Sequence, residues 1–242
     1  MNEEERYLFD LRGYLVVESV LNPEELRELN AYLDTLCWEE QSGSKHVHTG
    51  MDKDYVRRGN ADPLRGPVDL YTGLLCDWGP AFERLVKHAR LHPYLVELLG
   101  EQYRLDQQYA ILMKRGQETA TTHELHGGAT PYQPDGYYQF HAGRFLTHLV
   151  AVSFALTDAP GATGGFCCIP GSHQSHLPVP AHFKQIEQPA PCVQQIPVKA
   201  GDVIMFTEAI AHGCLAWTAS YERRALMFKY CPAYMRWEGS EH

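Results

Sequence analysis

The chain of 242 residues is long enough to bury one sizeable core, and barrels or sandwiches of this length form a single domain, so we expect one domain over 1–242. Its formal net charge of -9 is spread along the chain and offers no footprint for nucleic acid or an anionic membrane, which favours a small-molecule partner. The acidic N-terminus lacks a signal-peptide pattern and no apolar run approaches a membrane span, so a cytoplasmic location is expected.

The first hundred residues are predicted to be mainly helical and to support the rest of the domain. Asn22, Pro23 and Glu25 combine a helix cap, a first-turn proline and a capping-box acid, and leucines follow at helical spacing. This pattern predicts a helix over about 23–37. A short β-favouring run at 13–17 precedes it, and a second helical zone covers about 80–99.

After Gly100 the pattern changes to apolar runs of five to ten residues, separated by glycine and proline. This texture predicts an all-β barrel or sandwich over about 101–235. The stretch from Gly127 to Gly143 contains two prolines and two adjacent tyrosines and exceeds an ordinary connector. Its length is typical of a lid or substrate loop.

Two of the thirteen histidines have a context that favours metal binding. His126 follows a plausible strand and precedes two glycines, where the chain can turn sharply beside the imidazole. His212 ends a second strand-like unit over 201–211 and is followed by Gly213. Two imidazoles from separate strands suit a borderline divalent ion such as Fe(II), in a site that keeps positions open for substrates.

Arg223 follows His212 by eleven residues, at the start of a β-like run over 224–230. A buried guanidinium there is a good bidentate partner for the distal carboxylate of a small diacid. Taken singly, these three residues are more often a turn histidine, a strand-end histidine and a surface arginine. Their order along the chain favours the functional interpretation.

Further motifs lie along nearly the whole chain: the run at 13–17 with its Pro-Glu-Glu-Leu helix start, and the segments 113–116, 155–159, 164–173 and 200–203. With His126, His212-Gly213 and Arg223, they resemble the phytanoyl-CoA dioxygenase-like family of Fe(II)/2-oxoglutarate-dependent oxygenases. The resemblance implies a mainly β fold with a helical N-terminal part, in which a double-stranded β-helix (jelly-roll, cupin-like) core is flanked by helices.

The same resemblance assigns roles to individual residues. His126 and His212 match the iron ligands, and Arg223 matches the residue that pairs with the far carboxylate of 2-oxoglutarate. Gln108 and Phe154 fall in strands that line the co-substrate pocket in the family. Cys214 stands where a small hydroxyl residue often contacts the co-substrate. His173, in Pro-Gly-Ser-His, resembles a structural turn histidine and is left off the metal.

One position departs from the pattern of the hydroxylating members. Their first histidine belongs to a His-x-Asp or His-x-Glu motif, whereas this chain has Gly128 at the carboxylate position. Aliphatic halogenases of the superfamily carry Gly or Ala there, which implies that chloride fills the vacated position. The favoured prediction is therefore chlorination of an aliphatic C–H bond in a small molecule, with Fe(II), 2-oxoglutarate, O2 and chloride, and with His126, Gly128, His212 and Arg223 as the catalytic set.

Other outcomes remain open at this stage. Glu124 lies two residues before His126 and would face the same side of a regular strand, which would give a hydroxylase. Asp135 is a weaker source of a carboxylate, and a hydroxylase with only two protein ligands is a further alternative. A binding protein that keeps the fold but has lost turnover is a remote one. The sequence reveals neither the substrate nor the oligomeric state.

Overall fold

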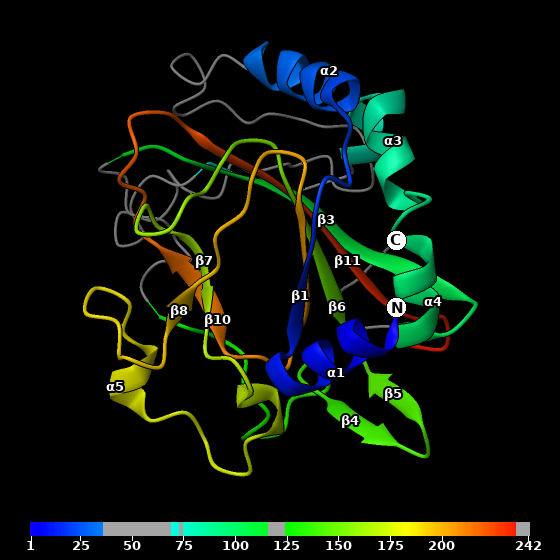
Figure 1. The fold of residues 1–242 in the computed structure, drawn as a ribbon, viewed down its shortest axis with the longest axis vertical. Coiled ribbons are helices and arrows are strands. Elements are labelled where there is room, and N and C mark those ends of the chain that lie inside the picture. Colours follow the sequence, from blue (N-terminus) through cyan, green and yellow to red (C-terminus); the bar gives the residue numbers. More distant parts are fainter. Residues whose placement is uncertain (36–68, 73–74, 116–123, 236–242) are drawn as a thin grey trace.

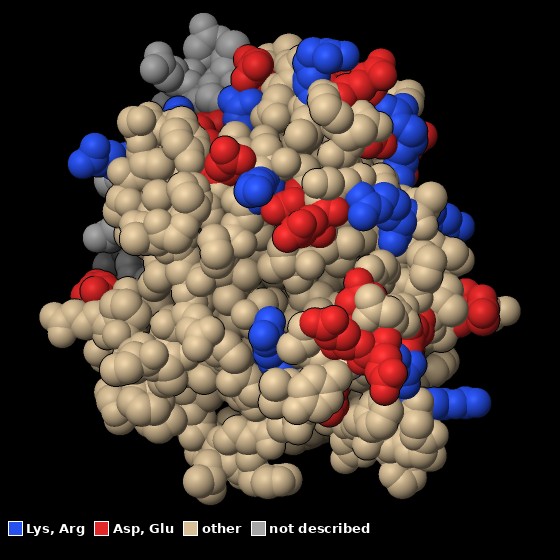
Figure 2. Space-filling view, in the orientation of Figure 1, with Lys and Arg blue, Asp and Glu red and all other residues tan. Residues whose placement is uncertain are grey.

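The computed structural model describes residues 1–35, 69–72, 75–115 and 124–235. Much of the predicted helical support, over 36–68, lies outside the described residues. Within them, no helix is long and apolar enough to cross a membrane. On the face shown in Figure 2, acidic and basic side chains lie interspersed instead of gathering into a patch of one sign.

The N-terminal helices form where the capping signals predict them. Asn2 and Asn22 each accept a hydrogen bond from the backbone of a capping-box glutamate, and these boxes open the first two helices. The predicted zone at 80–99 is two helices, each with a proline in its first turn. The helices and 3-10 turns are α1 Glu3–Arg12, α2 Pro23–Asp34, η1 Leu75–Trp78, α3 Pro80–Val86, α4 His92–Leu99, η2 Ser172–Gln174 and α5 Ala181–Lys184.

The described strands form a six-stranded sheet, a three-stranded sheet and a hairpin. The large sheet has the order β1-β9-β6-β11-β3-β2, the small one β10-β7-β8, and the hairpin is β4-β5. All of these pairings are antiparallel. The strands are β1 Tyr14–Val17, β2 Asp69–Thr72, β3 Tyr103–Met113, β4 Tyr138–His141, β5 Arg144–Thr147, β6 Val150–Ala155, β7 Gly165–Cys168, β8 Gln194–Gln195, β9 Val203–Thr207, β10 His212–Leu215 and β11 Arg223–Pro232.

The large sheet separates two apolar cores. In Figure 1, α2, α3 and α4 lie along the top and right of the molecule, while β7, β8 and β10 lie at the left. One core fills the space between the large sheet and the helices, and the other lies between the two sheets. This jelly-roll-like arrangement, with more strand than helix and helices at the N-terminus, confirms the predicted fold class.

Alternation along β11 decides which side chains reach the space between the sheets. Phe228 belongs to the core under the helices, whereas Met227 belongs to the core between the sheets. Because successive side chains of a strand point to opposite faces, Arg223 and Lys229 share the face of Met227. Two cationic side chains of β11 therefore point into the interior of the jelly roll: Arg223 at the start of the strand and Lys229 further along it.

Candidate metal centre

The structure brings His126 and His212 together. They form an antiparallel bridge in which the backbone N–H of His126 donates to the carbonyl of His212 at 2.9 Å, and the reverse bond measures 2.8 Å. Their ring centroids lie 4.1 Å apart. His126 is exposed and His212 is buried, so the pair is fixed by the backbone and accessible from one side.

Glu208 is the third member of the cluster. It follows β9 in the short turn before β10, and its ligand atom and those of His126 and His212 all lie within 4.8 Å of one another. Glu208 Oε2 is 3.8 Å from His212 Nε2. The His212 Nδ1 lies 2.8 Å from the carbonyl oxygen of Ile210, so an Nδ1–H donates there and Nε2 keeps its lone pair for a metal.

The ionisation states in the cluster are those that a metal requires. Burial alone would raise the pKa of Glu208, but the adjacent Lys229 ammonium, with smaller contributions from the histidines, lowers it to about 2. Burial lowers the pKa of His212 to about 3, and burial also lowers the pKa of His126. At neutral pH the cluster therefore offers two neutral imidazoles and one carboxylate.

This donor set fits Fe(II). Two histidines and one carboxylate make up the facial triad of non-heme iron oxygenases, which leaves open positions on the metal. Metal ligands must bind in their deprotonated forms, and the cluster holds them so. Among the described residues it is the one group of three such side chains with this spacing.

The two glycines after His126 have a packing role that the sequence interpretation missed. Gly127 has φ +79°, and a Cβ built on it would lie 2.4 Å from the carbonyl oxygen of Ile210 and 2.8 Å from that of Glu208. The Gly128 N–H donates to the Ala209 carbonyl at 3.0 Å. Gly127 thus lets the Glu208 turn pack directly against the segment that carries His126.

The inference of a vacant ligand position at Gly128 is accordingly corrected. A Cβ built on Gly128 would meet Val179 Cγ2 at 3.3 Å and no atom of the metal cluster within 4 Å. Glu208 places a carboxylate in the cluster, so neither chloride nor halogenation is supported by the geometry. Glu124 is exposed and pairs with Gln185, and neither it nor Asp135 belongs to the cluster.

Arg223 and Cys214 lie in the interior that the cluster opens into. Arg223 is 5% exposed, its Nη1 contacts Met113 Sδ at 3.2 Å, and no carboxylate of the described residues forms an ion pair with it. A Cβ on Gly165 would come within 2.9 Å of the Arg223 Nε, so this glycine makes room for the guanidinium. Cys214 is buried in the core between the sheets, two residues after His212.

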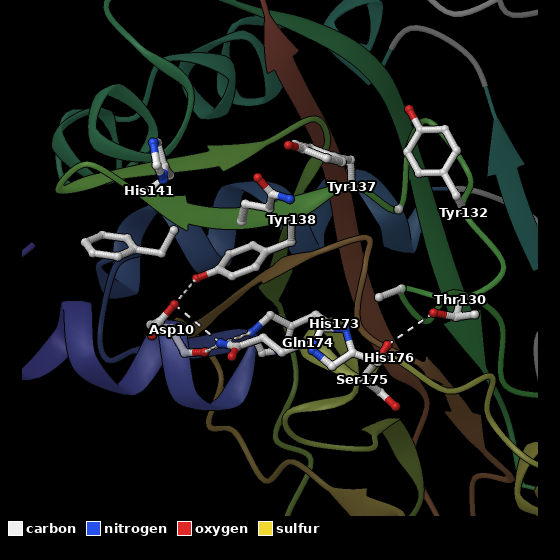
Figure 3. Close-up of a pocket in the computed structure, with 14 residues that line it drawn as sticks. Asp10, Thr130, Tyr132, Tyr137, Tyr138, His141, His173, Gln174, Ser175 and His176 are labelled. Atoms are coloured by element: carbon white, nitrogen blue, oxygen red, sulfur yellow. Dashed lines mark hydrogen bonds between the residues drawn. The ribbon is translucent and has the colours of Figure 1, made fainter.

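A surface hollow of about 690 Å³ lies beside the predicted substrate loop, and none of the three cluster residues lines it. In Figure 3 the Tyr138 hydroxyl points at Asp10, to which it donates at 2.7 Å. His173 lies next to them, with Nε2 2.9 Å from the Asp10 carbonyl oxygen, and so ties η2 to α1. The loop over 127–143 contains β4, and its contact with substrate stays a prediction.

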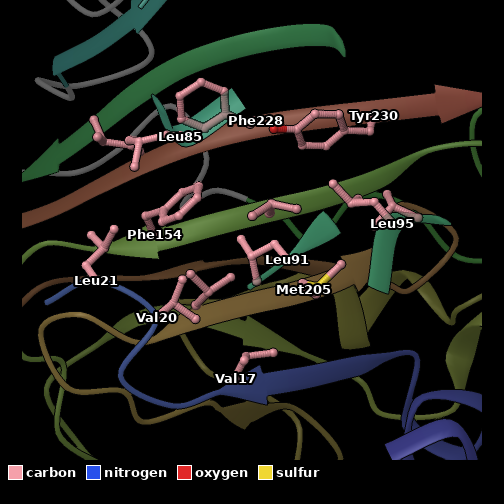
Figure 4. Packing of buried hydrophobic residues seen from close by; sticks show 14 of the residues in the cluster. Val17, Val20, Leu21, Leu85, Leu91, Leu95, Phe154, Met205, Phe228 and Tyr230 are labelled. Carbon is pink, nitrogen blue, oxygen red and sulfur yellow. The ribbon is translucent and has the colours of Figure 1, made fainter. Parts of the chain in front are cut away.

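Gln108 and Phe154 do not face the interior, contrary to the sequence prediction. The Gln108 amide oxygen accepts a hydrogen bond from the Cys76 N–H at 3.1 Å, on the helix side of β3. Phe154 is fully buried under the helices, edge-on to Phe228, as Figure 4 shows. Their alternating neighbours, Tyr109 on β3 among them, face the space between the sheets instead.

Glu208 and Lys229 are the two residues of the centre that the sequence interpretation missed. The one available signal was the spacing, since Glu208 precedes His212 by four residues. In a regular strand that spacing would separate the two Cα atoms by about 13 Å. The turn between β9 and β10 removes this separation, and it was not predicted because 201–211 was interpreted as a single strand-like unit.

Comparison with known proteins agrees with this description. The family model of phytanoyl-CoA dioxygenase (PhyH) matches residues 9–225. An ectoine dioxygenase from Nocardia farcinica is 22% identical over 236 residues, which cover 88% of this chain and 72% of that protein.

Solved structures share the fold. HygX from Streptomyces hygroscopicus, with nickel and 2-oxoglutarate bound, superposes with a TM-score of 0.78 at 22% identity over 97% of this chain and 89% of that one. SnoN, a 2-oxoglutarate-dependent epimerase from nogalamycin biosynthesis, gives a TM-score of 0.65 at 21% identity over 96% and 83%. Because the family match spans residues 9–225, the chain belongs to the phytanoyl-CoA dioxygenase family and is an enzyme of the Fe(II)/2-oxoglutarate-dependent dioxygenase superfamily.

Proposed function

We propose that this enzyme oxidises an aliphatic C–H bond of a small molecule as a hydroxylase-type oxygenase, with iron held by His126, Glu208 and His212. The observation that carries the proposal is the Glu208 carboxylate, which lies with both imidazoles inside a 4.8 Å cluster. A carboxylate ligand completes the protein side of the facial triad. Chloride is not needed to supply the negative charge.

Iron in this site would couple dioxygen to the oxidative decarboxylation of 2-oxoglutarate. The balance is that one dioxygen gives one oxygen atom to succinate and one to the substrate, while carbon dioxide leaves and the C–H bond becomes C–OH. The metal itself would be held by two neutral imidazoles, of His126 and His212, and by the Glu208 carboxylate. The open side at His126 gives access from solvent.

Arg223 is the proposed partner of the far carboxylate of 2-oxoglutarate. Its guanidinium is buried and, among the described residues, it contacts the thioether sulfur of Met113, which does not neutralise a charge. A buried cation without an anion is costly, and a bound carboxylate offsets that cost with bidentate hydrogen bonds. Cys214 lies on the same interior face, where its thiol offers a weak donor.

The relatives support a small-molecule substrate. One HygX structure holds hygromycin B with nickel and 2-oxoglutarate, and one SnoN structure holds nogalamycin RO with iron. We extend only the size class of these ligands to this chain. The particular substrate is left to a screen of small molecules by their effect on 2-oxoglutarate consumption.

The test measures succinate formed from 2-oxoglutarate with Fe(II) and oxygen, in buffers with chloride or with sulfate in its place. We expect equal rates in both buffers, at least a hundred-fold loss in Glu208→Gln, and little change in Glu124→Gln. Glu124 is the matched control because it is an acid two residues from a ligand and outside the cluster. Activity that needs chloride and survives in Glu208→Gln would contradict the proposal.

A further inference from the structure

The two oxygens of the Glu208 carboxylate have different partners. Oε1 lies 2.9 Å from Lys229 Nζ, and Oε2 lies 3.8 Å from His212 Nε2. Lys229 reaches this position from β11, which β6 separates from β9, the strand that precedes Glu208. One oxygen is therefore engaged by a cation while the other faces the histidines.

Lys229 is itself held from two sides. Its ammonium forms an ion pair with Glu208 Oε1 at 2.9 Å and lies 5.7 Å from the ring centre of Tyr109, which comes from the neighbouring strand β3. Lys229 is 9% exposed and Glu208 6%. A long side chain fixed in this way loses the rotamer freedom that a surface lysine keeps. The Glu208 carboxylate is thus restrained by an ammonium group that has little freedom to move.

The pair is not explained by fold stability alone. Two buried charges lose their hydration, and replacing such a pair by apolar residues is often neutral or stabilising. Side chains that orient a metal ligand are, by contrast, a recurrent part of metal sites, and their removal lowers metal affinity or activity. Lys229 contacts the carboxylate of a proposed ligand, Glu208, and this position matches that second role.

We propose that Lys229 is a positioning residue of the metal centre, which engages Glu208 Oε1 so that Oε2 alone is presented to the metal. The proposal rests on the proposed function, because it needs Glu208 to be a ligand. A carboxylate free to turn could bind through both oxygens and occupy a second position on the metal. Holding one oxygen away keeps that position for the co-substrate or dioxygen.

The rival account is that Lys229 only neutralises the charge of Glu208. Both accounts expect the metal-free protein to lose stability without the lysine. They differ on metal affinity when the titration is run at a pH high enough to keep Glu208 ionised without the lysine. There, removing a cation near a divalent ion removes a repulsion and strengthens binding if charge is all that matters. If positioning matters, the loss of orientation weakens binding.

The experiment is calorimetric titration of the metal-free protein with Ni(II), for wild type, Lys229→Met, Lys229→Gln, Glu208→Gln and Arg104→Met. We expect Lys229→Met to weaken Ni(II) binding by about 10- to 100-fold. Lys229→Gln should lose less, because its amide can still donate to Oε1. Arg104→Met is the matched control, since Arg104 pairs with the buried Asp106 at 2.5 Å and neither residue belongs to the metal cluster.

The outcomes distinguish the positioning role of Lys229 from the proposed set of metal ligands. Unchanged or tighter Ni(II) binding in Lys229→Met overturns the positioning role, provided Glu208→Gln binds weakly. Unchanged binding in Glu208→Gln contradicts the proposed ligand set instead. If Lys229→Met does not fold, as judged by circular dichroism, Lys229→Gln decides: affinity equal to wild type overturns the role, and an intermediate loss supports it.

Discussion

A single carboxylate changes the interpretation of the chemistry. Position 128 is a glycine, and Glu208, from a different turn, is the carboxylate that lies with His126 and His212. Its ammonium partner on β11 lowers its pKa to about 2, in a place where burial alone would raise the pKa. Glu208 is therefore far in the sequence from position 128, where the sequence motif would place the carboxylate.

The same buried groups predict an acid-sensitive metal-free protein. His212, with a pKa of about 3, stays neutral in the folded state, while in the unfolded chain it takes up a proton below its ordinary value of 6.5. Glu208 acts in the same direction between 4.5 and about 2. Since the unfolded state binds more protons, the free energy of unfolding should fall below pH 6.5, by about 1.4 kcal/mol per pH unit for each such group.

Urea unfolding in the presence of a chelator, at steps from pH 7.5 to pH 4.5, measures this slope. His212→Gln should remove one proton from it and flatten the curve between pH 6.5 and pH 4.5. A free energy of unfolding that rises as the pH falls through this window would contradict the assignment of His212 as a buried neutral imidazole.

At the scale of elements, the metal centre is assembled by a turn and a backbone bridge. His126 and His212 are joined by two hydrogen bonds, and Gly128 N–H ties the same segment to the Glu208 turn. Gly127 is required by the close approach of these two chain segments, and Gly128, the position that looked like a lost ligand in the sequence, has φ +99°, which favours glycine.

Gly127→Ala tests this contact. The new Cβ would collide with two carbonyl oxygens, at 2.4 and 2.8 Å, so we expect metal affinity to fall and the free energy of unfolding to drop by about 3 kcal/mol or more. Gly143→Ala is the control, because φ is +78° there and nothing lies within 4 Å. That variant should lose only about 1–2 kcal/mol and keep its metal affinity. Equal effects of both substitutions on metal binding would contradict the packing role.

Local sequence signals predict well where helices and strands occur, but they predict poorly which face of a sheet a side chain occupies. The helix that starts at Pro23 follows from its capping box, which acts within one turn of chain. The two histidines follow from strand ends beside glycines. Which face of β6 carries Phe154, however, depends on which core each face meets, and this is set by the helices that pack on the sheet. The short turn that brings Glu208 to His212 likewise depends on how β9 and β10 enter different sheets.

At the scale of the whole molecule, the large sheet divides structural support from chemistry. The helix-facing core carries Phe154 and Phe228, and the core between the sheets borders the metal cluster and Arg223. This division could be foreseen in outline, because helical patterns fill the N-terminal part and strand patterns the rest. The residues on each side of the sheet could not be assigned without the pairing of strands.

A pair of substitutions on opposite faces tests the division. Phe154→Leu should lower the free energy of unfolding by about 1–3 kcal/mol and leave the KM for 2-oxoglutarate unchanged. Arg223→Leu should raise that KM by at least about thirty-fold, the equivalent of about 2 kcal/mol for a buried charged contact. Both values come from chemical unfolding and succinate assays. A large rise of KM in Phe154→Leu would return this residue to the co-substrate pocket.

We propose above all that His126, Glu208 and His212 together hold the iron. The most direct measurement is a crystal structure prepared without oxygen, with Fe(II), 2-oxoglutarate and bromide, in which anomalous scattering locates both iron and halide. We expect iron bonded to the two imidazoles and to one oxygen of Glu208, with no bromide on the metal. Bromide bonded to iron beside Gly128, with Glu208 paired only to Lys229, would contradict it.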